Sequence, residues 1–117
     1  MKTILVTGGC GFIGSNFIQN VLQKDSSAHI LNLDRLTYAG NLMNLASISK
    51  KKYTLVRGDI CDKGLVESLF NEYSFQSVVH FAAESHVDRS IDNPSKFIQT
   101  NIVGTLNLLE QSKKFIL

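Results

Sequence analysis

The sequence predicts an α/β fold, a doubly wound parallel sheet of four strands in the order 3-2-1-4. Short β-branched runs alternate with longer segments whose apolar residues recur at helical spacing, and a glycine-rich turn joins the first run to the first helical segment. Such alternation builds parallel βαβ units, and right-handed crossovers between them decide most of the strand order. The 117 residues are enough for one hydrophobic core.

Four segments carry the strand pattern. Three longer ones, after the first, third and fourth strands, carry a clear helix pattern, and a weakly helical stretch lies after the second. The predicted strands are residues 3–7, 29–33 ending on Asp34, 53–59 and 77–83, and the first and last are apolar on both faces. A first helix of about three turns follows the glycines, a weakly helical stretch begins near Asn41, and a long final helix follows Pro94. The apolar positions that mark the helices are Phe12, Ile13, Phe17, Ile18, Val21 and Leu22; Leu65, Val66, Leu69 and Phe70; and Phe97, Ile98, Ile102, Leu106 and Leu109.

Composition excludes several classes of protein. The formal charge is +2, and the basic residues are scattered except for the run 50–52, which we expect to be a solvated turn, so neither nucleic acid nor a membrane is the expected partner. No stretch approaches the roughly 18 apolar residues of a membrane span, and the N-terminal apolar run is a strand rather than a signal peptide. Cys10 and Cys61 have no metal-ligand or disulfide spacing, which indicates a reducing cytoplasm and no metal site.

The turn after the first strand has the spacing of a dinucleotide-binding loop. Gly9, Gly11 and Gly14 spell G-x-G-x-x-G between a predicted strand and a predicted helix. In that setting the first glycine allows a tight turn, the second lets the backbone approach a pyrophosphate, and the third allows close packing of helix on strand. The helix N-terminus then offers N–H groups to the phosphates. These features together predict a Rossmann-type domain.

An acidic residue stands where the adenosine ribose of a dinucleotide would lie. Asp34 follows Gly14 by 20 residues, at the end of the second strand. Its carboxylate can accept the ribose hydroxyls but repels a 2′-phosphate, which predicts NAD rather than NADP. The neighbouring Arg35 is a complication, because a guanidinium can pair with that phosphate.

The motifs resemble those of a known family. "TGGCGFIG" is similar to the fingerprint of the extended short-chain dehydrogenases/reductases, and "LDRLTYAGNLMNL", "GDICD" and "HFAAESHVDRSI" resemble the nucleotide-sugar 4,6-dehydratases, most closely those acting on dTDP-glucose. The resemblance runs from Met1 to about Gln111. Enzymes that act on GDP-mannose or UDP-sugars, and related epimerases, remain alternatives.

The resemblance implies a set of binding residues, all at the carboxyl ends of the four predicted strands or on the final helix. The pyrophosphate would lie against the glycine loop, the adenosine along the ends of the second and third strands, and the nicotinamide beyond the fourth. The implied cofactor residues are Gly8, Gly11, Phe12, Ile13, Gly14, Asp34, Arg35, Leu36, Thr37, Asp59, Ile60, Phe81, Ala82, Ala83, Ser85 and Thr100, and Ser85, His86 and Arg89 would face the sugar nucleotide.

Several of these residues also have plainer interpretations. His86 can be an ordinary loop histidine, and Ser85, His86 and Asp88 lie too close together in one loop to form a hydrolase triad. His80, inside an apolar strand, is interpreted as packed rather than catalytic. Cys10 can have a lowered thiol pKa beside a helix N-terminus, but a passive turn cysteine is the preferred interpretation.

The sequence lacks the residues that the implied reaction needs. By resemblance, the enzymes oxidise the sugar at C4 with NAD⁺, eliminate water across C5 and C6, and return the hydride to C6, using a Tyr-x-x-x-Lys pair and an Asp-Glu pair. Neither pair occurs here. We therefore expect residues 1–117 to be the N-terminal portion of an NAD-binding Rossmann domain, inactive alone, without the later strands and the substrate domain.

The alternative is a stand-alone NAD-binding module. The complete enzyme is expected to be a homodimer. In the chain as given the fourth strand becomes an apolar sheet edge, which predicts self-association.

Overall fold

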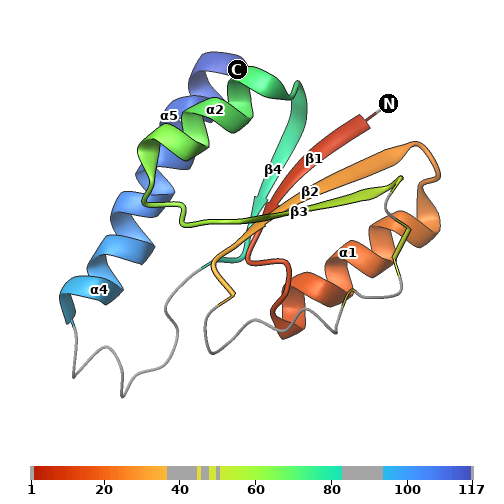
Figure 1. The fold of residues 1–117 in the computed structure, drawn as a ribbon, viewed down its shortest axis with the longest axis horizontal. Helices are drawn as coiled ribbons and strands as arrows, with labels where there is room; N and C mark the ends of the chain where they lie inside the picture. Colours follow the sequence, from red (N-terminus) through yellow and green to blue (C-terminus); the bar gives the residue numbers. More distant parts are fainter. Residues whose placement is uncertain (1, 37–44, 46–47, 50, 83–93, 117) are drawn as a thin grey trace.

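The structure, a computed structural model, describes residues 2–36, 45, 48–49, 51–82 and 94–116. Its elements follow one another as strand, helix and strand along most of the chain (Figure 1). They are β1 (Lys2–Thr7), α1 (Phe12–Lys24), β2 (Ala28–Asp34), β3 (Tyr53–Arg57), α2 (Lys63–Glu72), β4 (Phe75–His80), α4 (Pro94–Ile98), the π-helix η2 (Gln99–Gly104) and α5 (Thr105–Phe115).

The four strands form one parallel sheet in the order β3-β2-β1-β4, which confirms the predicted fold class and strand order. Helix α1 covers one face, and α2 and α5 cover the other, so the sheet is wound on both sides (Figure 1). Side chains alternate between the two faces along each strand. In β2, Ile30 packs toward α1 and Leu31 packs toward α2.

The strands lie close to their predicted positions, but β3 ends at Arg57 rather than at residue 59, and β4 is shifted. β4 begins at Phe75 and ends at His80, whereas the sequence predicted residues 77–83. The strand includes Phe75, whose ring packs edge-on against Phe70 of α2, with the ring centroids 5.1 Å apart. The strand ends where the N–H of Phe81 makes its last backbone bond, 2.8 Å from the carbonyl of Thr7.

The long final helix exists but is not a regular α-helix. Residues 99–104 form a π-helical segment between α4 and α5, which periodicity did not predict. Its apolar stripe also faces outward: the side chains of Ile98, Ile102, Leu106 and Leu109 are between 50% and 62% exposed. The buried residues of the segment are Thr100, Gly104, Asn107, Leu108 and Gln111.

Other local predictions have mixed outcomes. Ile18 and Leu22 of α1 are buried as expected, while Phe12 and Ile13 are exposed. Residues 51–52 form the turn expected before β3. The weakly helical stretch after Asn41 falls almost entirely outside the described residues.

A candidate dinucleotide-binding site

The glycine loop, residues 8–11, joins the carboxyl end of β1 to the start of α1 (Figure 1). Gly8 has φ +69°, a left-handed conformation that side chains rarely adopt. A Cβ on Gly8 would lie 2.6 Å from the backbone nitrogen of Ala82, and one on Gly14 would lie 2.5 Å from the carbonyl oxygen of Gly8. The third glycine of the motif therefore does allow the close approach of helix and loop, but the left-handed turn falls one residue before the motif.

The loop's own N–H groups bond within the protein. The N–H of Gly8 donates to the carbonyl of Leu33 (3.0 Å), and the N–H of Gly11 donates to the carbonyl of Gly8 (3.3 Å). The intervening two N–H groups are taken by side chains of β2: Gly9 donates to Asn32 Oδ1 and Cys10 to Asp34 Oδ2, each at 2.8 Å. These bonds hold the loop in place against β2.

Donors for a ligand are left on the first turn of α1. The N-cap residue Gly11 makes no side-chain capping bond, and a helix supplies no carbonyl partners for its first N–H groups. The exposed side chains of Phe12 (81%) and Ile13 (68%) flank this turn. The arrangement presents N–H groups and the positive end of the helix dipole at the carboxyl edge of the sheet, which suits a phosphate.

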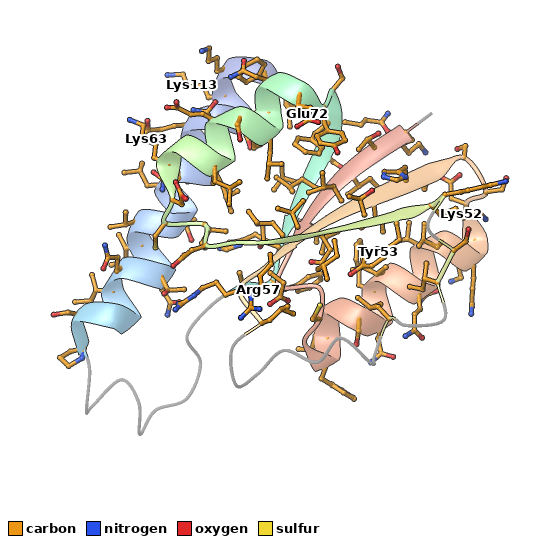
Figure 2. All side chains as sticks on the ribbon, in the orientation of Figure 1. Lys52, Tyr53, Arg57, Lys63, Glu72 and Lys113 are labelled. Carbon is orange, nitrogen blue, oxygen red and sulfur yellow. The ribbon has the colours of Figure 1, made fainter. Side chains whose placement is uncertain are left out.

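Asn32 anchors the loop from the middle of β2, and sequence analysis missed it. Its side chain is fully buried, and its amide nitrogen donates to the hydroxyl of Tyr53 (3.0 Å) while its oxygen holds Gly9. Tyr53 begins β3, at the end of the strand opposite Arg57 (Figure 2). The available signal was a polar residue in the apolar run "HILNL".

Cys10 is a passive turn residue, as preferred from the sequence. Its side chain is buried, and Asn32 Nδ2 lies 3.4 Å from its sulfur. Burial, reinforced by the negative charge of Asp34, raises the pKa of the Cys10 thiol to about 11. The alternative of a lowered thiol pKa is therefore wrong, because desolvation by burial outweighs the hydrogen bonds with Tyr53 and Asn32, which lower the pKa.

Asp34 connects the glycine loop to the segment after β2. Besides accepting from Cys10, its carboxylate accepts from the N–H of Leu36 through Oδ1 (2.7 Å). Leu36 has φ +58°, an uncommon conformation for a branched residue. Each carboxylate oxygen has a second lone pair, so Asp34 can still accept a bond from a ribose hydroxyl.

Arg35 and Asp59 meet across the ends of β2 and β3. Arg35 Nε lies 3.4 Å from Asp59 Oδ2. The other oxygen of Asp59 accepts from the N–H of Cys61 (2.9 Å), and the carbonyl of the buried Ile60 accepts from Asn107 of α5 (2.9 Å). Two residues proposed for the adenosine side are thus paired with each other.

His80, the last residue of β4, joins three elements through both ring nitrogens. Its Nδ1 bonds to the hydroxyl of Thr7, and its Nε2 lies 3.0 Å from the hydroxyl of Thr105. Because the Thr105 hydroxyl donates to the carbonyl of Asn101 (2.9 Å), it accepts from Nε2–H. Nδ1 then accepts from Thr7, whose oxygen accepts from the N–H of Ala82 (3.2 Å). Burial lowers the pKa of His80, consistent with this neutral ring.

The π-helix η2 lies beside the loop that follows β3. Thr100 is buried in this helix, and the sulfur of Cys61 lies 3.2 Å from the carbonyl of Gln99. A Cβ on Gly104 would overlap the side chain of Ile60. The loop after β3 therefore packs directly against this turn, and π-helical turns are often found at functional sites.

The remaining predicted site residues, Thr37, Ala83, Ser85, His86 and Arg89, lie outside the described residues, as does the Ser85-His86-Asp88 cluster. Among the described residues, no group of three metal-ligating side chains occurs. None of the described helices has the length and apolar character that crossing a membrane requires.

The parallel sheet, its strand order and the glycine loop define a protein of the Rossmann type. The chain belongs to the GDP-mannose 4,6-dehydratase family, whose model matches residues 5–116. This confirms the resemblance to nucleotide-sugar 4,6-dehydratases that the motifs indicated.

The similar proteins include several dTDP-glucose 4,6-dehydratases. The enzyme of Salmonella typhimurium is 49% identical over 113 residues, 96% of this chain and 31% of the enzyme, and that of Xanthomonas campestris is 52% identical over 98% of this chain and 32% of the enzyme. A crystal structure of the Bacillus anthracis enzyme in complex with NAD is 45% identical and superposes with a TM-score of 0.85, covering 98% of this chain and 34% of that one. The chain spans about a third of the length of these relatives.

Proposed function

We propose that residues 1–117 form the N-terminal portion of an NAD-binding domain in an enzyme that converts dTDP-glucose to dTDP-4-keto-6-deoxyglucose. One observation carries the proposal. The glycine loop bonds its own N–H groups to β2 and to itself, which leaves the first turn of α1 to receive a pyrophosphate beside Asp34. The relatives that share this segment are named for that reaction.

The residues present fit NAD. At Gly8 and Gly14 only glycine fits against the protein's own backbone, which keeps the loop and the first turn of α1 close together, and the buried carboxylate of Asp34 keeps acceptor capacity for ribose hydroxyls. When bound, NAD accepts the hydride from the sugar and returns it. The proposed cofactor residues are Gly8, Gly11, Phe12, Ile13, Gly14, Asp34, Arg35, Leu36, Thr37, Asp59, Ile60, Phe81, Ala82, Ala83, Ser85 and Thr100; Ser85, His86 and Arg89 are proposed for the sugar nucleotide.

The role of this chain is binding and orientation. The helix N-terminus would hold the pyrophosphate, Asp34 the ribose, and the segment after β4 the nicotinamide side. Since the sequence has neither a Tyr-x-x-x-Lys nor an Asp-Glu pair, we expect the 117 residues alone to give no turnover.

A hybrid enzyme tests the proposal. The matching N-terminal segment of the Salmonella dehydratase is replaced by this chain, and formation of the 4-keto sugar from dTDP-glucose is followed with and without added NAD. We expect NAD-dependent turnover by the hybrid and none by the chain alone. A folded hybrid that binds no NAD would contradict the proposed cofactor, and turnover by the chain alone would contradict its role as a part.

The second candidate, a stand-alone NAD-binding module, is tested by calorimetric titration of the chain. Tight NAD binding by a folded monomer would favour the module over the dehydratase part. Discrimination between dTDP-glucose and GDP-mannose or UDP-sugars is measured by offering each nucleotide sugar to the hybrid.

We further propose that the complete enzyme is a homodimer in the cytoplasm. The exposed apolar residues along α4, η2 and α5 are suited to a helix-to-helix interface. Cys10 and Cys61 form no disulfide, which fits a reducing compartment.

A further inference from the structure

Among the described residues of the site, Arg35 argues against NAD. It follows Asp34 directly, at the carboxyl end of β2, where a guanidinium can bind the 2′-phosphate of NADP. The carboxylate of Asp34 predicts NAD, but the adjacent guanidinium could oppose that preference by pairing with the 2′-phosphate of NADP. The preference must depend on what else Arg35 contacts.

In the structure Arg35 is engaged by Asp59. The two side chains meet at 3.4 Å and are 31% and 38% exposed. Ion pairs at this level of exposure add little to stability. Removal of the pair should therefore release Arg35 without unfolding the protein.

Asp59 is the fixed member of the pair. Its Oδ1 is held by the N–H of Cys61, which leaves Oδ2 for Arg35. The loop is anchored on both sides, by the bond from Gly58 N–H to the carbonyl of Asp34 (3.0 Å) and by the bond from Asn107 to the carbonyl of Ile60. A rigid carboxylate of this kind can set the direction of a long, flexible side chain.

We propose that Asp59 is a specificity-determining positioning residue, which selects NAD over NADP by holding the guanidinium of Arg35 away from the ribose edge of Asp34. This inference rests on the proposed dinucleotide function and deepens it. With Arg35 engaged, a 2′-phosphate meets the carboxylate of Asp34 without a compensating cation. With Arg35 released, the cation can pair with that phosphate.

The test is the ratio of the dissociation constants for NADP and NAD, measured by calorimetry on the full 117-residue chain and on the hybrid enzyme. The ratio is used because loss of an adenine contact weakens both cofactors alike. Asp59→Asn should lower the ratio about tenfold, which corresponds to about 1.4 kcal/mol. Asp59→Glu, which keeps the charge, should restore most of the preference for NAD.

The matched control is Asp62→Asn. Asp62 lies in the same loop and caps α2 by accepting from the N–H of Leu65, a role that asparagine also fills. The substitution removes the same negative charge without affecting Arg35, so the ratio of the two dissociation constants should not change.

A double-substitution cycle separates positioning from plain charge. In an Arg35→Gln background, Asp59→Asn should no longer change the ratio. An unchanged ratio in Asp59→Asn, or an equal fall with and without Arg35, would overturn the inference and leave the proposed function standing. If neither the unsubstituted chain nor the unsubstituted hybrid enzyme binds either dinucleotide, the proposed function itself is overturned, and the inference with it.

Discussion

Gly14 lies on the first turn of α1, where the helix is packed against backbone. The nearest atoms to an added methyl group are the carbonyl oxygen of Gly8 at 2.5 Å and the Cα of Gly9 at 2.8 Å. Neither can move without displacing the loop. Gly64, near the start of α2, is exposed, and its added methyl group would lie 3.7 Å from the nearest atom, Asp62 Oδ1. Gly64 therefore serves as a matched control for Gly14, since both lie near the start of a helix but only Gly14 is tightly packed.

We expect Gly14→Ala to lower the free energy of unfolding by about 1–3 kcal/mol and to weaken NAD binding, because the helix must move away from the loop. Gly64→Ala should stay within about 1 kcal/mol of the wild type and leave NAD binding unchanged. Urea unfolding and calorimetric titration measure both effects. If the two variants have the same free energy of unfolding and the same NAD affinity, the close packing at Gly14 contributes to neither property.

At the level of elements, His80 connects β1, β4 and α5. Its neutral ring accepts a hydrogen bond from Thr7 and donates one to Thr105. A proton on Nδ1 would strengthen no hydrogen bond of this network. The network fixes the end of β4 relative to the π-helical turn. The stability contributed by this hydrogen-bond network should therefore depend on pH.

We expect the free energy of unfolding to fall as the pH drops below about 6.5. Because burial lowers the pKa of His80 in the folded state from its ordinary value of 6.5, the unfolded chain binds the proton first, and protonation favours unfolding. The slope from this group is at most about 1.4 kcal/mol per pH unit. Urea midpoints at pH 7.5 and 5.5 measure it.

His80→Gln should be less stable at pH 7.5 and should lose this decline. His29→Gln, on β2, removes a histidine of the same sheet and should keep the decline, since His80 remains. Asp25 does not interfere: hydrogen bonds from Ser27 and a pairing with Lys2 lower the Asp25 pKa to about 2, so its contribution is lost only as the pH falls from 3.8 toward 2. A wild-type stability that is flat from pH 7.5 to 5.5 would contradict the role assigned to His80.

Over the whole molecule, the sheet edges and one helix face are left without a neighbour in the described part of the chain. β4 is one of the two edge strands of the sheet, the other being β3, and its Val78 and Val79 are only partly buried. On the layer beside it, Ile98, Ile102, Leu106 and Leu109 are exposed along one side of the final helical segment. Exposed strand edges and apolar helix faces both promote association.

We expect the 117-residue chain to self-associate, with a mass by light scattering above the 13.0 kDa of the monomer. Leu106→Gln combined with Leu109→Gln should reduce the association. Glu110→Gln combined with Lys113→Gln changes two exposed polar residues of the same helix and keeps the net charge, so it should have no effect. A monodisperse wild-type monomer would contradict the prediction.

The local pattern of the sequence determined the strands, their order and the position of the glycine loop. Hydrophobic period and glycine spacing are local properties, and parallel βαβ units admit few topologies. Asp34 could be found in this way because its place at a strand end is set by distance along the chain. The family could be recognised because its motifs are contiguous.

Only the tertiary structure decided which contacts these residues make. Asn32 holding Gly9, Asp59 engaging Arg35, and Thr105 orienting His80 each join residues more than 20 positions apart, and no periodicity encodes such pairs. The π-helix and the outward apolar stripe were likewise not predicted by periodicity, and in the structure Gly104 of the π-helix lies against the side chain of Ile60 while the stripe is exposed. The sequence by itself indicated where the proposed dinucleotide site lies, whereas the fold decided which hydrogen-bonding atoms at that place already have partners, because those partners are brought together in space.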